Sequence, residues 1–212
     1  NGEEAPIDVP DINRIIGGAL AEGRSFLLAH ESAGILHAAG VRAPRSVIAR
    51  SIREAIDAAE SIGYPVVMKI VSRNVLHKSD AGGVALDILS NEEVIDAYEA
   101  IMKNVREYKP GAVIDGIEVC SMARPGTEII IGSRIDPSFG PIVMCGLGGI
   151  YVEVMKDVAF RALPISLNEA DSMIREIRSF PLLLGVRGEK RKDIEWVIDT
   201  IIRVGTIIMK CD

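Results

Sequence analysis

Apolar residues recur along the chain with two different periods, and each period predicts a different kind of element. A spacing of three to four residues predicts amphipathic helices over about 11–23, 26–39, 51–62, 90–107, 166–178 and from 193 onward. Short apolar runs bounded by glycine and proline predict strands near 46–49, 65–71, 84–89, 113–123, 127–135 and 141–146. The chain therefore alternates helices and strands at first and becomes strand-rich in its middle.

Helix boundaries are marked by capping signals. A Ser-x-x-Glu capping box begins at Ser51, at Ser90 and again at Ser166, and Asp193 precedes the last helical pattern. The two ends of the chain carry weaker signals. We expect an extended arm over 1–10, followed by the first helix, and the start of a further strand over 207–212.

The order of elements predicts an α+β protein of two small sheets with a cleft between them. Glycines punctuate the three strands of the middle region, as they do in antiparallel hairpins. We expect an N-terminal arm and helix over 1–25 and a two-lobed domain over 26–212, with the lobes meeting near residue 120.

Composition narrows the class of protein. The chain has 212 residues, 48% of them hydrophobic, 25% charged and only 4% aromatic, as in a globular α/β or α+β protein. Its formal charge of −6 argues against a nucleic-acid binder, since phosphate backbones require a basic face. No apolar run reaches the length of a membrane span. Three widely spaced cysteines form no CxxC pair, which fits a reducing cytoplasm.

Lys69 is the first candidate for chemistry. It interrupts the apolar run 65–71, and burying an ammonium group without a partner is costly. An anion such as phosphate would neutralise a Lys69 ammonium that points into a cleft. A lysine on an exposed strand face or at a strand end fits the same pattern.

A loop follows this strand and joins it to the next one. It contains His77, Lys78 and Ser79, and it ends in the pair Gly82-Gly83. Paired glycines let backbone N–H groups come close to an anion, although many hairpins also contain such a pair. The combination of these side chains with a strand lysine eight residues earlier favours a phosphate site. It is not a Walker A loop, because the required GxxxxGK[ST] spacing is absent.

His77 has the chemistry of a nucleophile toward phosphorus. Neutral imidazole is nucleophilic near pH 7, and a phosphohistidine transfers its phosphoryl group readily. The other two histidines, His30 and His37, lie seven positions apart on one helical pattern with no acidic or thiol ligand completing a metal set. We interpret them as structural or surface residues.

Two later segments contain further candidates. The run 116–126 could be a strand and turn whose backbone pairs with an adenine edge, or a plain core strand, and Glu128 faces either ligand or solvent. Glu153, Asp157 and Arg161 are four positions apart, so on a helix they would share a face as ligand contacts or as a surface ion pair.

Seven segments in order resemble the β subunit of the ADP-forming acetyl-CoA synthetases, a family related to succinyl-CoA synthetase. They are PVVMKI (65–70), HKSDAGGV (77–84), GTEIIIG (126–132), DPSFGPIV (136–143), GLGGIYVE (146–153), DVAFRALP (157–164) and LLLGVRG (182–188). Together they span about 60–190, with helical matches on both sides.

This resemblance implies an ATP-grasp fold, with the nucleotide held between two α+β lobes. It implies the reaction acyl-CoA + ADP + phosphate ⇌ carboxylic acid + CoA + ATP, with Mg²⁺, through a phosphohistidine relay. His77 matches the histidine that passes the phosphoryl group to ADP. The remaining matched positions are expected nucleotide contacts: Lys69 with Ser79, Gly82 and Gly83 at the phosphates, Cys120, Ser121 and Met122 facing adenine, and Glu128 as a polar contact near that pocket.

The chain departs from the family pattern at its end, where no acidic-x-Asn-Pro segment follows to supply magnesium ligands. The metal ligands are therefore unassigned, and Glu153 and Asp157 are at most outer contacts. The family implies a cytoplasmic heterotetramer of two such chains with two CoA-binding α subunits. Two alternatives stay open from the sequence: an ATP-grasp carboxylate–amine ligase, which forms an acyl phosphate without a phosphohistidine, and a non-catalytic nucleotide-sensing module.

Overall fold

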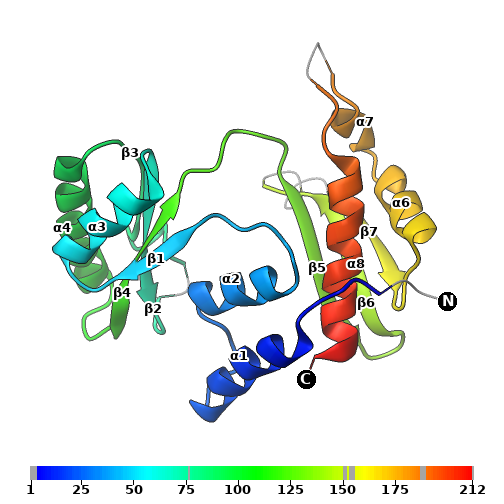
Figure 1. Cartoon of the computed structure of the whole chain (residues 1–212), viewed down its shortest axis with the longest axis horizontal. Helices are drawn as coiled ribbons and strands as arrows, with labels where there is room; N and C mark the ends of the chain where they lie inside the picture. The colour runs from blue at the N-terminus through cyan, green and yellow to red at the C-terminus, as the bar shows by residue number, and fades with distance from the viewer. Residues whose placement is uncertain (1–3, 76, 150–151, 153–155, 187–189, 212) are drawn as a thin grey trace. The chain divides into compact units, whose positions relative to one another are not determined.

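The computed structural model describes residues 4–75, 77–149, 152, 156–186 and 190–211. These residues form two compact units. One comprises residues 26–33 and 43–124, and the other residues 1–25, 34–42 and 125–212. The first contains Lys69 and is called the Lys69 unit, and the second contains Glu128 and is called the Glu128 unit (Figure 1). The expected division into 1–25 and 26–212 stays a prediction, and residues 4–25 group with the C-terminal half of the chain.

The Lys69 unit is built on a four-stranded antiparallel sheet in the order β1-β4-β2-β3. Its strands are β1 (Ser46–Ala49), β2 (Val66–Ser72), β3 (Val84–Ile88) and β4 (Ile114–Ser121). Helices α3 (Ile52–Ile62) and α4 (Asn91–Tyr108) pack on one face of this sheet (Figure 1). The predicted strands near 46–49, 65–71 and 84–89 are confirmed.

Strand β2 shows how the sequence forms this layer. Its alternate residues Val66, Met68 and Ile70 lie in the core beneath the two helices, with Ile117 and Val119 of β4. Successive side chains of a strand point to opposite faces, so Val67, Lys69 and Val71 lie on the other face. The central strand is apolar on both faces except at Lys69, as the sequence pattern predicted.

The predicted caps are present. The hydroxyl oxygens of Ser51 and Ser90 accept hydrogen bonds from the N–H groups of Glu54 and Glu93, at 3.2 and 3.3 Å. The complete reciprocal box forms at Ser166, where the Glu169 carboxylate also accepts from the Ser166 N–H. These bonds satisfy donors that the first turn of a helix leaves unpaired.

The Glu128 unit contains a three-stranded antiparallel sheet in the order β5-β6-β7. Its strands are β5 (Ile129–Asp136), β6 (Gly140–Leu147) and β7 (Val158–Ala162). Its helices include α1 (Val9–Ala21), α6 (Leu167–Glu176), α7 (Phe180–Leu183) and α8 (Ile194–Lys210). Helices α6 and α8 cover one face of the sheet and bury Val143, Cys145 and Leu147 of β6. Helix α2 (Ala29–Ala38) has residues in both units.

Three expectations about this unit are wrong. Residues 207–210 continue helix α8 instead of starting a strand, and the Cys211 N–H still donates to the Ile207 carbonyl at 2.9 Å. The N-terminal segment turns helical at Val9, because the Asp8 carboxylate caps the helix and Pro10 stands in its first turn. Residues 158–162 form strand β7, so Asp157 and Arg161 do not share a helix face.

None of the described helices is long and apolar enough to cross a membrane.

Two glycines of the Glu128 unit should respond oppositely to the same substitution. Gly17 lies in exposed helix α1 with open space around a Cβ, so Gly17→Ala should raise the free energy of unfolding by up to about 1 kcal/mol. Gly140 has φ +72° in the β5–β6 turn, so Gly140→Ala should lower it by about 1–2 kcal/mol. Urea unfolding followed by Trp196 fluorescence reports on this unit. Changes of the same sign in the free energy of unfolding for the two substitutions would contradict the helical position of Gly17 or the turn position of Gly140.

Candidate functional site

Lys69 occupies the middle of the sheet in the Lys69 unit. Its Cα atom pairs with Val84 of β3 on one side and with Glu118 of β4 on the other. Cys120 pairs with Val67, two residues from Lys69, so its side chain lies on the same face as those of Lys69 and Glu118. This face is opposite the core under helices α3 and α4. Three polar side chains therefore share one surface of the sheet.

Burial raises the pKa of the Cys120 thiol above its ordinary value, while the Lys69 charge opposes that rise and the Glu118 charge adds to it. Cys120 is consequently a neutral thiol near pH 7 and a poor nucleophile. Its place beside Lys69 is compatible with a ligand contact and does not fit a covalent role.

The loop between β2 and β3 is folded back on itself. The N–H groups of Gly82 and Gly83 donate to the carbonyl oxygens of Ser79 and Lys78, at 3.0 and 2.8 Å, and the Gly83 carbonyl accepts from the Ile70 N–H at 2.8 Å. These N–H groups are therefore engaged in the turn and would have to leave it to bind an anion. The phosphate contact expected of the two glycines stays a prediction.

The glycines are required here by close packing. A Cβ atom at Gly83 would lie 2.6 Å from Ile70 Cγ2, and one at Gly82 would lie 2.8 Å from the Asn104 side-chain nitrogen. Gly82 also has φ +60°, where side chains are strained. The pair lets the loop lie directly against strand β2 and helix α4.

The side chains of the loop differ in exposure. Those of His77, Ser79 and Asp80 are exposed, whereas Lys78 is half-buried. The His77 imidazole makes no hydrogen bond or ion pair with any described residue. It is therefore accessible to a phosphoryl donor, which a nucleophilic histidine requires.

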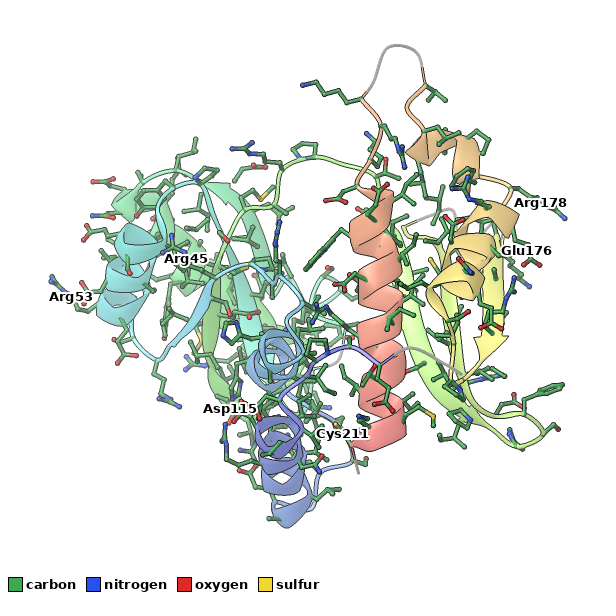
Figure 2. The ribbon with its side chains drawn as sticks, turned by 45° about the vertical axis from the view of Figure 1, so that its right-hand side comes forward. Arg45, Arg53, Asp115, Glu176, Arg178 and Cys211 are labelled. Atoms are coloured by element: carbon green, nitrogen blue, oxygen red, sulfur yellow. The ribbon has the colours of Figure 1, made fainter. Side chains whose placement is uncertain are left out.

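The segment after β4 was expected to face adenine. The N–H groups of Ser121 and Met122 donate to the Arg45 and Pro65 carbonyl oxygens, at 3.0 and 3.2 Å. The Arg45 guanidinium, whose side chain is labelled in Figure 2, in turn donates to the Ile62 carbonyl oxygen at the end of α3, at 2.7 Å. These bonds fix the strand end but occupy two of its donors. An adenine edge would have to pair with other backbone groups of the segment.

Glu128 belongs to the other unit, where it packs against a glycine pair. Its carbonyl oxygen accepts from the Gly148 N–H at 2.8 Å, and a Cβ atom at Gly149, which has φ +61°, would lie 2.8 Å from its carboxylate. The carboxylate is exposed and lies over the Gly-rich loop after β6. Glu128 and Lys69 belong to different units of the chain.

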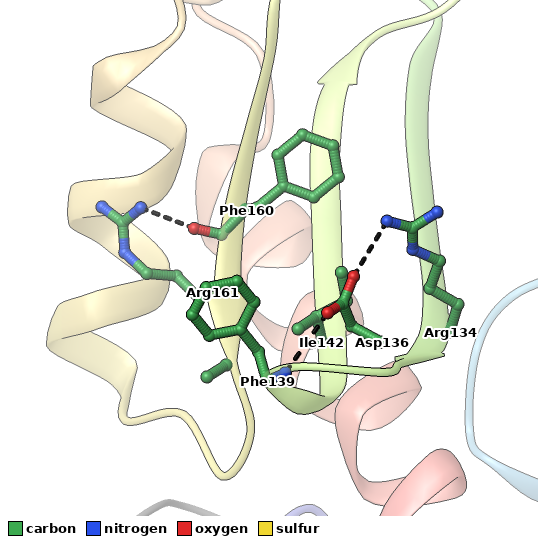
Figure 3. A pocket seen from close by; sticks show the side chains of 7 residues that line it. Arg134, Asp136, Phe139, Ile142, Phe160 and Arg161 are labelled. Atoms are coloured by element: carbon green, nitrogen blue, oxygen red, sulfur yellow. Dashed lines mark hydrogen bonds and ion pairs between the residues drawn. The ribbon is translucent and has the colours of Figure 1, made fainter.

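The β5–β6 hairpin borders a hollow that Arg161 lines, but none of the residues expected to contact the nucleotide lines it. Asp136 accepts from the N–H groups of Ser138 and Phe139, at 3.0 and 3.2 Å, and pairs with Arg134 (Figure 3). The Ser138 bond, with the others, holds the pKa of the Asp136 carboxyl below its ordinary value. Together these bonds hold the turn that joins β5 to β6.

Comparison with known proteins decides the family. A profile described as an ATP-grasp domain matches residues 18–212. The chain is 46% identical over 202 residues to subunit beta of ADP-forming acetate–CoA ligase I from Pyrococcus furiosus, covering 95% of this chain and 87% of that one.

The chain belongs to the ATP-grasp β subunits of the ADP-forming acetate–CoA ligases.

Solved structures agree with this assignment. The dinucleotide-forming acetyl-coenzyme A synthetase 1 of Candidatus Korarchaeum cryptofilum, in complex with coenzyme A, Ca-AMPCP and HgCl⁺, matches with a TM-score of 0.91 and 45% identity, over 93% of this chain and 86% of that one. Its complex with coenzyme A and Mg-AMPPCP, with a phosphohistidine segment pointing towards the nucleotide-binding site, matches with a TM-score of 0.83 and 40% identity, over 95% and 87%. The expected ATP-grasp fold is confirmed.

Glu118 of this ATP-grasp chain escaped the sequence analysis as a site candidate, and the half-burial of Lys78 was not predicted. Glu118 is 8% exposed and lies across from Lys69, and Lys78 is half-buried. Alternation along β4 could have identified Glu118, because it stands two residues before Cys120 and therefore shares its face. Nothing in the local sequence separates Lys78 from its exposed neighbours.

Metal ligands are not identified by the structure. Among the described residues no three His, Cys, Asp or Glu side chains gather to hold an ion. Glu153 lies outside those residues. Asp157 accepts hydrogen bonds from the N–H groups of Arg178 and Ser179, both at 2.8 Å, and from the Ser179 hydroxyl. Its carboxylate thus holds the turn before helix α7, and the suggestion that it is an outer metal contact gains no support.

The Asp157 carboxyl group should make the free energy of unfolding depend on pH. Burial acts to raise the pKa of its carboxyl, but the hydrogen bonds from Ser179 and Arg178 outweigh it, and the pKa falls below its ordinary value. Its contribution is therefore complete above the unfolded-state pKa and is lost as pH falls through the folded-state pKa, below about pH 4. Asp157→Asn should lower the free energy of unfolding at pH 7 by about 1–3 kcal/mol.

Urea unfolding followed by Trp196 fluorescence between pH 7 and pH 3 would measure the difference in unfolding free energy between the wild type and Asp157→Asn. This difference should become smaller as the pH falls. Asp171→Asn, in the more exposed ion pair with Arg175, is the matched control and should change stability at pH 7 by less than about 0.5 kcal/mol. Equal effects of the two substitutions would contradict the role assigned to Asp157.

Proposed function

We propose that this chain is the nucleotide-binding subunit of an ADP-forming acyl-CoA synthetase. The overall reaction would be acyl-CoA + ADP + phosphate ⇌ carboxylic acid + CoA + ATP. The observation that carries the proposal is the connection between Lys69 and His77. A strand lysine and an exposed histidine stand on one backbone hydrogen-bonded framework, in a chain 46% identical to a subunit of such a ligase.

His77 would relay the phosphoryl group. In the direction of ATP synthesis, a ring nitrogen of His77 attacks phosphorus, so that a P–N bond forms while the bond to the donor histidine of the partner subunit breaks. A terminal oxygen of ADP then attacks the same phosphorus, and the bond to His77 breaks. His77 returns to its neutral state at the end of the cycle, and no redox partner is needed.

Lys69 would hold the nucleotide phosphates during this transfer. A positioned ammonium group stabilises the charge on the transferring oxygens, and the apolar neighbours of Lys69 keep the local dielectric low. Ser79, Cys120, Ser121, Met122 and Glu128 remain proposed nucleotide contacts. Mg²⁺, which accompanies the nucleotide analogue in one Korarchaeum complex, would screen the phosphate charge, but no described residue is assigned to it.

The name "subunit beta" carried by the Pyrococcus relative supports a partner for this chain as well. We propose a CoA-binding α subunit, in a two-plus-two assembly in the cytoplasm. The partner would supply the acyl phosphate and the first phosphohistidine. Selection of the carboxylic acid would then lie on that partner.

The test is phosphoryl labelling of this chain with its CoA-binding partner. Incubation with γ-labelled ATP and Mg²⁺ should place acid-labile, base-stable label on the chain, and His77→Ala should abolish both the label and overall turnover while nucleotide still binds. His37→Ala is the matched control, because His37 is also exposed, and it should retain both. Normal turnover in His77→Ala would favour direct acyl-phosphate chemistry, and nucleotide binding without any label or turnover would favour a sensing module.

A further inference from the structure

The β5-β6-β7 sheet has a hollowed face that the proposed chemistry does not use. It is the face opposite helices α6 and α8, because those helices bury the alternate residues of β6. Two adjoining depressions on it, of about 340 and 290 Å³, share Arg134, Ile142 and Phe160, and together they are called the hairpin hollow. Strand register sets its floor in two rows, Gly132, Met144 and Phe160 in one and Arg134, Ile142 and Ala162 in the next.

Gly132 makes room in the hairpin hollow because it lacks a side chain. It stands inside strand β5, directly across from Met144. A Cβ atom at Gly132 would lie 3.7 Å from Met144 Cε, which is an ordinary contact. Packing within the chain therefore does not require glycine here, in contrast to Gly83. A glycine inside a strand weakens it and often marks the close approach of another molecule.

Two phenylalanine rings border the hairpin hollow and are open to solvent (Figure 3). Phe139 is 74% exposed at the tip of the hairpin, and Phe160 is 48% exposed on edge strand β7. Exposed aromatic side chains beside an arginine are typical of the centres of protein–protein interfaces. The volume of the hollow is at the lower end of the range for small-molecule pockets, about 300–1,000 Å³. A large side chain of a partner protein therefore fits it better than a cofactor.

The polar rim of the hairpin hollow has unused hydrogen-bond donors. Arg134, whose side chain is 70% exposed, donates through one guanidinium nitrogen to Asp136 at 3.1 Å. Its other two nitrogens have no partner among the residues that the structure describes. The Asp136 carboxylate already accepts from the N–H groups of Ser138 and Phe139 as well as from Arg134. The rim therefore complements a carboxylate, which guanidinium groups bind with good geometry.

The same rim disfavours a second copy of this chain as the occupant. A two-fold dimer uses one surface twice, so two copies of the rim would offer each other guanidinium donors. The second arginine at the hollow, Arg161, pairs with Glu176 of helix α6 at 2.6 Å, so that carboxylate is already engaged. The chemistry of the hollow thus favours a different protein that supplies both an apolar side chain and a carboxylate.

We propose that the hairpin hollow docks the CoA-binding partner subunit, which inserts a large apolar side chain over Gly132 and places a carboxylate on Arg134. This inference rests on the proposed function and adds the surface through which the partner is held. Burial of Phe139 and Phe160 at this contact would exclude water from the ion pair and strengthen it.

Calorimetric titration of the full chain with the separately expressed partner subunit tests the proposal. Gly132→Ile fills the hollow with a side chain that suits a strand, so it should weaken partner binding about tenfold or more while the urea unfolding midpoint stays at or above that of the wild type. Arg134→Glu should also weaken partner binding, and Arg134→Lys should weaken it less. The affinity of both Gly132→Ile and Arg134→Lys for ADP should stay within about twofold of the wild type.

Ile135→Ser is the matched control for these variants. Ile135 is 64% exposed on the same strand, but it is one residue from Arg134 and therefore points to the other face of the sheet. Its replacement should change partner binding by less than about twofold.

Other outcomes would overturn the proposal in distinguishable ways. If Gly132→Ile and Arg134→Glu bind the partner as Ile135→Ser does, the hollow is not the docking surface and the proposed function stands. If Gly132→Ile loses ADP binding, the hollow belongs to the nucleotide site instead. If the chain alone sediments as a dimer that Gly132→Ile dissociates, the occupant is a second copy. A wild-type chain that binds neither ADP nor the partner would overturn the proposed function as well.

Discussion

The hydrogen bond from the Ile70 N–H to the Gly83 carbonyl oxygen is the constraint on which the proposed chemistry depends. It joins the central strand, which carries Lys69, to the loop that presents His77. A second bond, from the Gly83 N–H to the Lys78 carbonyl, fixes the loop one step further. A strand lysine and a loop histidine thereby become parts of one hydrogen-bonded framework, and accurate placement of charge is what phosphoryl transfer requires.

Glycine serves this framework through its small size. A side chain at Gly83 would collide with Ile70, and one at Gly149 would collide with the Glu128 carboxylate. At Gly83 the missing Cβ lets the loop backbone lie against strand β2 beside Lys69, and at Gly149 it leaves room for the Glu128 side chain. The Gly83 N–H is already engaged in the turn, so the positive charge for an anion has to come mainly from side chains on the sheet face. Lys69 has that charge.

Much of the fold follows from local sequence signals, whereas the site depends on pairing between distant strands. Ser51, Ser90 and Ser166 cap helices as predicted, because a capping box is decided within four residues. Strand β7 was missed because it is short and its pairing with β6 is a tertiary choice. The end of α8 was misread because a run of isoleucines fits strand and helix alike, and contacts of Gly205 and Thr206 with distant residues decide it. The register of β4 with β2 shows that Glu118 lies directly across from Lys69, which no local signal predicts.

The most direct test of the account is a crystal structure of the chain with ADP and Mg²⁺. The account predicts that the β-phosphate lies within hydrogen-bond distance of Lys69 Nζ, on the sheet face opposite helices α3 and α4, with His77 directed toward the phosphate. A nucleotide bound elsewhere, for example on the surface of α3 and α4, with no contact to Lys69, would contradict it.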